Sequence, residues 1–187
     1  PHSYNAHLQP PVWDWIAYRS ARQGEIDAAA RAGANADVVI GIQASFTADF
    51  IHQVLEAKLI RYGRTPRIFS GGFNQYRQEL MDPKSAHYSA APNYTVLLLD
   101  PRQSGQTTIR EIEQIAKVHA EELPASRLIV SNFFRMSNES PDVSELNAGL
   151  LNIARPRPQI RILDMERWSA QWGWQKIVDP KHEFLAG

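Results

Sequence analysis

The sequence predicts an α/β domain built on a five-stranded parallel sheet. Short segments rich in Val, Ile and Leu alternate along the chain with segments whose apolar residues recur at helical spacing. The short segments are almost continuously apolar, which is typical of strands that helices cover on both faces. Alternating strands and helices favour a parallel sheet with right-handed crossovers. The expected strands are Val38–Ile42, Arg67–Ser70, Thr95–Asp100, Arg127–Asn132 and Ile160–Asp164.

Helical patterns fill the intervals between these strands. Apolar residues recur at helical spacing over residues 46–62, and Gly63 is placed to end that helix. Thr108 and Glu111 form a capping box, which predicts the start of a second helix. Ser140-Pro141 combines an N-cap serine with a first-turn proline and predicts the start of a third.

The composition indicates one globular domain. The 187 residues are 43% hydrophobic and 21% charged, values that argue against large-scale disorder. We expect residues 36–187 to form the α/β domain, and residues 1–35 to form a helical extension that packs on it, with its helix around Trp13–Ala32. Because the chain begins with Pro1 rather than Met and shows no signal-peptide pattern, we expect a domain of a longer protein.

Several function classes are disfavoured by what the sequence lacks. The net charge is zero without a basic stripe, so no nucleic-acid partner is expected. No apolar run approaches the roughly 18 residues that span a membrane, and we expect a cytoplasmic location. The absence of cysteine excludes disulfides, thiolate zinc sites and a cysteine nucleophile. Neither a Walker loop nor a Gly-x-Gly-x-x-Gly loop is present, so no nucleotide cofactor is expected.

The histidines do not indicate a metal site, because no pair has the i, i+4 spacing of a metal-binding helix. His52 and His119 fall inside helical patterns, and His87 falls in an expected loop over Asp82–Tyr88. We interpret all three as surface histidines or as histidines with satisfied hydrogen bonds, and we expect no metal.

The strongest chemical signal combines Ser45 with the run Asp179-Pro-Lys-His182. Ser45 ends the first strand-like stretch and is expected to begin the next helix, whereas Asp179 and His182 lie near the end of the chain. An imidazole that takes the serine proton, oriented by a carboxylate, makes serine a competent nucleophile. The three residues therefore predict the catalytic triad of a serine hydrolase. The alternatives are an N-cap role for Ser45 and a solvated turn at Asp179–His182.

Further candidates follow the carboxyl ends of the other strands, where parallel α/β sheets bind their ligands. Gly72 could lend its backbone N–H to an oxyanion hole, and Asn74 and Asn132 could donate from their side chains. Asp100 lies at the same edge, and Arg102 could assist in binding an anionic substrate. The topology alone would bring such residues together even in an α/β protein without catalysis.

Two stretches of sequence carry a family resemblance. They read Ser45-Phe-Thr-Ala-Asp49-Phe and Gly72-Phe-Asn-Gln-Tyr-Arg-Gln-Glu-Leu-Met-Asp-Pro-Lys-Ser85-Ala-His-Tyr88, and the strand that leads into Asp100 follows. They resemble the amino-terminal, SGNH-like region of FkbH-type proteins, which belong to the HAD superfamily and act in polyketide and related biosynthetic pathways. Ile162–Asp164 and Asp179–Ala186 look similar to that family too, so that the resemblance covers roughly residues 36–186.

The resemblance implies a three-layer, flavodoxin-like SGNH fold placed before a HAD domain that loads a phosphoglyceryl unit onto an acyl carrier protein. This chain contains no HAD motif and no cysteine, the residue with which glyceryl loading is associated in the family. It also departs from the SGNH pattern twice. Gln43-Ala44 replaces the usual Gly-Asp before the serine, and Leu99-Asp-Pro-Arg102 replaces the usual Gly-x-Asn-Asp stretch.

Two functions are therefore expected as alternatives. The first is a serine hydrolase or acyltransferase that acts on an acyl ester or a carrier-protein thioester in a polyketide-type pathway, without a cofactor. The second is a catalytically degenerate SGNH-like module that docks an acyl carrier protein or a glyceryl or phosphoglycerate substrate. The expected partners are an acyl carrier protein or a neighbouring domain of a longer biosynthetic protein. A phosphate or glycerate site at helix N-termini is a third option.

Overall fold

The computed structural model describes residues 36–100, 106–134 and 143–172. In these residues five parallel strands form one sheet in the order β2-β1-β3-β4-β5, which is the flavodoxin-like order. The fold class predicted from the sequence is confirmed, and each strand end lies within two residues of its expected position. The strands are β1 (Val38–Ala44), β2 (Pro66–Ser70), β3 (Tyr94–Leu98), β4 (Arg127–Ser131) and β5 (Ile160–Leu163).

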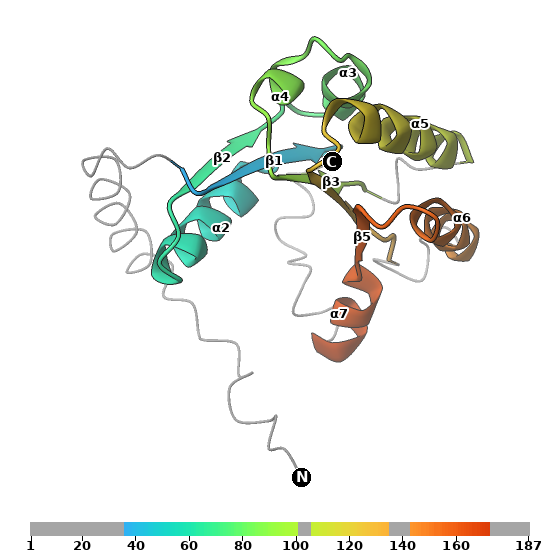
Figure 1. Cartoon of the computed structure of the whole chain (residues 1–187). Helices are drawn as coiled ribbons and strands as arrows, with labels where there is room; N and C mark the ends of the chain where they lie inside the picture. The colour runs from blue at the N-terminus through green and yellow to red at the C-terminus, as the bar shows by residue number, and fades with distance from the viewer. Residues whose placement is uncertain (1–35, 101–105, 135–142, 173–187) are drawn as a thin grey trace.

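Helices cover both faces of this sheet and produce three layers (Figure 1). One face carries α2 (Asp49–Arg61), and α7 (Met165–Trp172) lies on the same side in the view of Figure 1. The opposite face carries α3 (Tyr76–Met81), α4 (Ala86–Ser89), α5 (Gln106–Glu122) and α6 (Ser144–Ala154).

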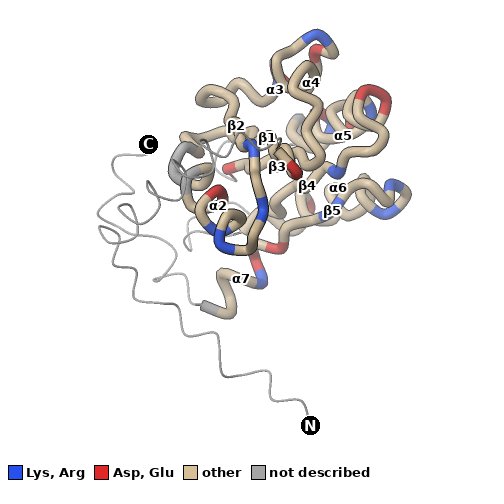
Figure 2. The backbone as a smooth tube through the Cα atoms, turned by 60° about the vertical axis from the view of Figure 1, so that its left-hand side comes forward, with Lys and Arg blue, Asp and Glu red and all other residues tan. Residues whose placement is uncertain are grey.

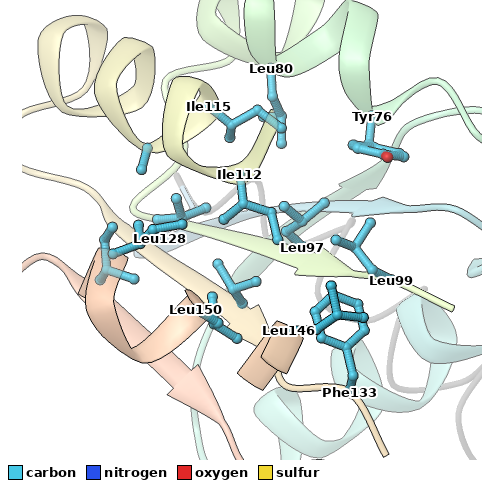
Figure 3. Close-up of a cluster of buried hydrophobic side chains, with 14 of the residues drawn as sticks. Tyr76, Leu80, Leu97, Leu99, Ile112, Ile115, Leu128, Phe133, Leu146 and Leu150 are labelled. Carbon is cyan, nitrogen blue, oxygen red and sulfur yellow. The ribbon is translucent and has the colours of Figure 1, made fainter. Parts of the chain in front are cut away.

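Side-chain alternation along the strands divides the core between the two faces. The smaller cluster lies under α2 and includes the β1 side chains of Val38, Ile40 and Ile42. The larger cluster joins α3, α5 and α6 to β3 and β4, as Figure 3 shows. Burying one Val, Leu, Ile or Phe side chain contributes about 1.5–3 kcal/mol to folding, so these two clusters supply much of the stability of the sheet. The largest members that are fully buried are Phe133, Leu80, Leu97, Ile112, Ile115, Leu128 and Leu150.

Three helix starts differ from the sequence-based expectation. One is that of α6, which begins at Ser144 with Val143 at its N-cap, three residues after the expected N-cap Ser140. The first helix begins at Asp49 and has Ala48 at its N-cap, so Ser45 neither begins nor caps it. The helix after β3 begins at Gln106, which places Thr108 inside its first turn rather than at the cap. The end of α2 is as predicted, because Gly63 follows the C-cap with a φ of +72°, a conformation that glycine adopts without steric cost.

Lys and Arg residues occur on the turns that lead into β2 and β5 (Figure 2). In the first turn, Arg64 Nε pairs with Asp37 Oδ2 at 2.9 Å. Before β5, Arg157 donates to the carbonyl of Ile153 at 2.8 Å, near the end of α6. These cations therefore stabilise helix ends and turns, where the backbone carbonyls concentrate negative potential. Among the described helices, none is both long enough and apolar enough to cross a bilayer.

Candidate functional site

The reversal of strand order between β1 and β3 defines the candidate site. β1 is followed along the chain by β2 on one side and then by β3 on the other. In open parallel sheets, ligands bind at the carboxyl ends of the strands on either side of such a switch point. Ser45 follows β1 directly, and Asp100 lies just beyond β3. Both are buried, with exposed fractions of 2% and 6%.

Ser45 makes two hydrogen bonds across this switch point. Its backbone N–H donates to the carbonyl of Leu98 at 3.0 Å, which extends the pairing of β1 with β3 past Ala44. Its Oγ accepts the backbone N–H of Asp100 at 2.8 Å. The hydroxyl oxygen therefore satisfies a buried amide, and the side chain joins the ends of two strands.

Gly72 and Asn74 lie at the same edge, in the loop that follows β2. Gly71 continues the pairing of β1 with β2, since its N–H donates to the carbonyl of Ile42 at 2.9 Å. The carbonyl of Gly72 accepts the N–H of Gln75 at 3.1 Å. Asn74 is exposed and has a φ of +53°, in the left-handed region that asparagine tolerates better than most residues. This loop thus presents polar groups to solvent beside the switch point.

Asn132 lies at the end of β4 and organises the start of α7. Its side-chain oxygen accepts the backbone N–H of Met165 at 2.6 Å and that of Glu166 at 3.2 Å. Its amide nitrogen donates to Asp164 Oδ1 at 3.0 Å. Asp164 Oδ1 also accepts the N–H of Arg167, as an N-cap side chain does. The expected oxyanion donor is therefore engaged with α7 here, and β3 separates it from β1.

Three of the expected site residues lie outside the described residues. They are the triad members Asp179 and His182, and Arg102. The triad and the anion contact stay predictions.

A buried polar chain that the sequence analysis did not identify crosses the face under α4 and α5. Gln43 Nε2 lies 3.2 Å from His87 Nδ1, and His87 Nε2 lies 2.9 Å from Thr95 Oγ1. His119 Nε2 approaches the same hydroxyl at 3.0 Å. All four side chains have exposed fractions of at most 1%. We call these four residues the histidine chain.

Both imidazoles are poor bases in this setting. Burial, and to a lesser degree the neighbouring His119, lower the pKa of His87 to about 4. Burial alone lowers the pKa of His119 to about 4. Both rings are therefore neutral at pH 7. The interpretation of His119 as a surface histidine or one with satisfied hydrogen bonds holds only in part: the ring is buried, its Nε2 contacts Thr95, and its Nδ1 has no hydrogen-bond partner among the described residues. His87, expected in a loop, lies in helix α4.

Glycines make room for the histidine chain. A Cβ at Gly41 would lie 2.6 Å from His87 Cε1 and 2.8 Å from Phe69 Cζ, so only glycine lets the ring approach the strand. A Cβ at Gly71 would overlap the side-chain oxygen of Gln43. The inner end of the loop after β2 therefore rests on Gln43. Polar residues inside otherwise apolar strands, Gln43 and Thr95, were the sequence signal for this chain, because such residues need buried partners.

A surface cluster connects α3 to α5 beside this chain. Arg77 Nε pairs with Glu111 Oε2 at 2.9 Å, and the Tyr76 hydroxyl donates to the same oxygen at 3.3 Å. Burial raises the pKa of Tyr76, and the adjacent Arg77 acts in the opposite direction. Within the residues that the structure describes, no group of three or more acidic or histidine side chains is arranged to hold a metal ion.

No protein-family model matches the chain, and no curated protein matches it. Its fold is similar to that of a solved structure, the N-terminal part of the protein BF1531 from Bacteroides fragilis, which contains a phosphatase domain and is complexed with Mg. The TM-score is 0.66 at 14% sequence identity, and the match covers 90% of this chain. The chain spans about half the length of that structure, with 50% of it covered. At this identity the similarity concerns the fold alone.

Proposed function

We propose that the chain is a non-catalytic, SGNH-like module of an FkbH-type biosynthetic protein, and that its C-terminal sheet edge docks an acyl carrier protein or the glyceryl unit that the carrier bears. The observation that carries this proposal is the hydrogen bond between Ser45 and the backbone of Asp100. A serine that attacks an ester must present its oxygen to the substrate and pass its proton to a base. Ser45 is instead covered, and its oxygen already accepts an amide.

Two departures from the SGNH pattern support the same proposal. Gln43 stands two residues before Ser45, where the pattern has glycine, and its side chain belongs to the histidine chain. Leu99-Asp100 replaces the stretch that usually supplies an oxyanion asparagine, and Asp100 supplies the amide that Ser45 accepts. Asn132, the other candidate donor, is engaged with Asp164. Asp100 and Asn132 are thus engaged in structural hydrogen bonds, while the expected oxyanion donors Gly72 and Asn74 lie in the exposed loop after β2 and stay predictions.

The fold similarity is consistent with a module of a larger protein. The solved relative of this fold contains a phosphatase domain, and this chain spans half of it. In the FkbH-type family that the sequence resembles, a glyceryl unit passes through a phosphatase-type domain to a carrier protein. A docking module beside such a domain would keep the carrier close to the reaction and raise its effective concentration.

A serine hydrolase or acyltransferase is the second candidate, favoured by the position of Ser45 immediately after β1 at the switch point. In that mechanism Ser45 Oγ forms a bond to the acyl carbon while His182 takes the hydroxyl proton and Asp179 orients the imidazole. His182 then gives the proton to the departing alcohol or thiol, and water or an acceptor releases the acyl group. The Asp100 amide would have to leave Ser45 before attack.

One experiment separates the two candidates. The full chain is incubated with a fluorophosphonate probe and its intact mass is measured, while binding of a glyceryl-loaded acyl carrier protein is measured by calorimetry. Docking predicts saturable carrier binding without a mass increase. Labelling that disappears in a folded Ser45→Ala variant supports the hydrolase instead and overturns the docking proposal. Absence of both labelling and carrier binding also overturns it. Thr47→Ala, which alters an exposed hydroxyl two residues away, is the matched control.

A further inference from the structure

The histidine chain connects the interior of the molecule to the candidate site. It begins at His119 on α5, passes through Thr95 on β3 and His87 on α4, and ends at Gln43 beneath Gly71. We propose that this chain is a proton-sensitive device. While both imidazoles are neutral it holds α4 and the Gly71–Asn74 loop on the sheet, and their protonation opens this segment locally before the rest of the fold unfolds.

The pattern of donors and acceptors requires neutral rings. The amide nitrogen of Gln43 can only donate, so His87 Nδ1 accepts and its proton resides on Nε2. That proton is donated to Thr95 Oγ1, whose own hydroxyl proton is left for His119 Nε2. A proton added to His87 Nδ1 would face the amide protons of Gln43. A flip of the Gln43 amide would accept that proton, but it would leave the new charge without a counter-charge.

Among the described residues, no carboxylate hydrogen-bonds to a nitrogen of either ring. From the strands, Gly41, Gln43, Phe69 and Thr95 are uncharged. From α3, Glu79 accepts the backbone N–H of His87 at 3.0 Å rather than a ring nitrogen.

The remaining titratable groups come from α4 and α5. Tyr88 packs edge-on against the His87 ring, and burial raises its pKa, with Glu122 of α5 acting in the same direction. His119 itself would be a second cation on the same hydroxyl. Two protonated imidazoles would therefore repel each other inside a low-dielectric core, and both effects favour opening.

The opening is expected to be local because few groups hold α4. This helix has four residues, and its polar attachments lead to α3: Ser85 Oγ donates to the Glu79 carbonyl at 2.7 Å, and the Tyr88 hydroxyl donates to the Leu80 carbonyl at 2.8 Å. In contrast, α2 packs through a separate cluster on the opposite face of the sheet. Short elements with few buried contacts open at a lower free energy than the core.

Opening would alter the candidate site as well. Gly71 rests on the side chain of Gln43, and the exposed Phe73 and Asn74 follow it at the C-terminal edge. Losing the Gln43–His87 contact would release the loop that flanks the switch point. The device itself does not depend on the docking function proposed above, so the two are tested separately.

Hydrogen exchange measured by mass spectrometry on the full chain tests the proposal at pH 7 and pH 5. Rates are normalised to those of an unstructured peptide at each pH. Peptides that cover residues 71–90 should lose protection by at least about tenfold at pH 5, since each imidazole with a pKa near 4 when closed and near 6.5 when open can contribute this much. Peptides from α2 (residues 49–61) should stay better protected than residues 71–90 at both pH values, because α2 packs through a separate cluster and opens at a higher free energy.

Matched variants identify the groups responsible. His87→Gln and His119→Gln remove the titrating proton while keeping an amide in the chain, and each should reduce the pH dependence at residues 71–90. His52→Gln on α2 should leave it unchanged. If the His87→Gln and His119→Gln variants do not fold, the pKa values of both imidazoles are measured in the unmodified protein by NMR titration. Titration of His87 and His119 near pH 6.5 overturns the proposal. So does unchanged protection at residues 71–90, or protection at pH 5 that is equal there and in α2.

Discussion

The Ser45 hydroxyl accepts the backbone N–H of Asp100 at 2.8 Å, and this bond spans the point where the strand order of the sheet reverses. The backbone N–H of Ser45 adds a second bond to the Leu98 carbonyl. The crevice that a parallel sheet leaves open at its switch point is therefore bridged by one side chain. Ser45 therefore has a structural role, since its two hydrogen bonds join the ends of β1 and β3.

Replacing Ser45 with alanine tests this contribution. The change leaves the buried N–H of Asp100 without a partner, and an unsatisfied buried donor costs about 1–3 kcal/mol of unfolding free energy. Urea unfolding followed by circular dichroism should show that loss. Thr47→Ala, at an exposed hydroxyl, should stay within about 0.5 kcal/mol of the unmodified protein. Equal unfolding free energies for the two variants would show that the Ser45–Asp100 bond is not stabilising.

Asn132→Asp tests the connection of β4 to α7. The variant keeps the oxygen that accepts the N–H of Met165, but it loses the donor to Asp164 and brings a second carboxylate to within about 3 Å of it. Loss of the Asn132–Asp164 hydrogen bond and the new repulsion should cost about 1–2 kcal/mol and increase hydrogen exchange over residues 165–172. Asn152→Asp, on the exposed face of α6, is the control. Unchanged exchange in α7 would contradict the assigned role.

Two glycine-to-alanine substitutions should change the stability of the fold by different amounts. At Gly41 the new Cβ would lie 2.6 Å from the His87 ring, which is enclosed, so overpacking should cost about 1–3 kcal/mol. At Gly149, inside α6, the nearest atom is Ile109 Cγ2 at 3.0 Å, so Ile109 needs to shift by only a few tenths of an ångström. There the higher helix propensity of alanine, worth up to about 1 kcal/mol, should offset the contact. Thermal unfolding of both variants measures the difference, and similar losses at the two sites would contradict the close approach of His87.

The strands and their parallel arrangement could be predicted from the sequence because continuous apolar runs report burial directly. Gly63 could be predicted too, since ending a helix in the left-handed region is a local property. Ser45 shows the limit of such reasoning. A serine between a strand and a helix usually caps the helix, but here a partner from β3 accounts for its hydroxyl. That partner lies 55 positions away in the sequence and leaves no local pattern.

The histidine chain could not be predicted for a similar reason. His87 lies in a four-residue helix that is too short to produce a periodic pattern, and its ring partners come from two strands, β1 and β3. Only Gln43 and Thr95, as polar exceptions inside apolar strands, indicated that the sheet face carries buried polar partners. Asn132 was correctly placed at a strand end, yet the sequence could not show that its amide is engaged by Asp164. The triad with Asp179 and His182 stays a prediction, because both lie outside the described residues.

The unfolding free energy should fall as the pH is lowered from 7 to 5. This range lies above the ordinary pKa values of Asp and Glu, so histidines account for the change. The pKa values of His87 and His119 are lowered to about 4 in the fold, against an ordinary 6.5, so the unfolded chain binds more protons as the pH falls. Their contribution is complete above about pH 6.5 and is lost as the pH falls toward 4. Each histidine should remove about 2 kcal/mol by pH 5 and about 3 kcal/mol by pH 4. Urea unfolding at pH 7, 6 and 5 measures the slope, which His119→Gln should roughly halve. A stability that is flat over this range would mean that these rings are not buried as neutral groups.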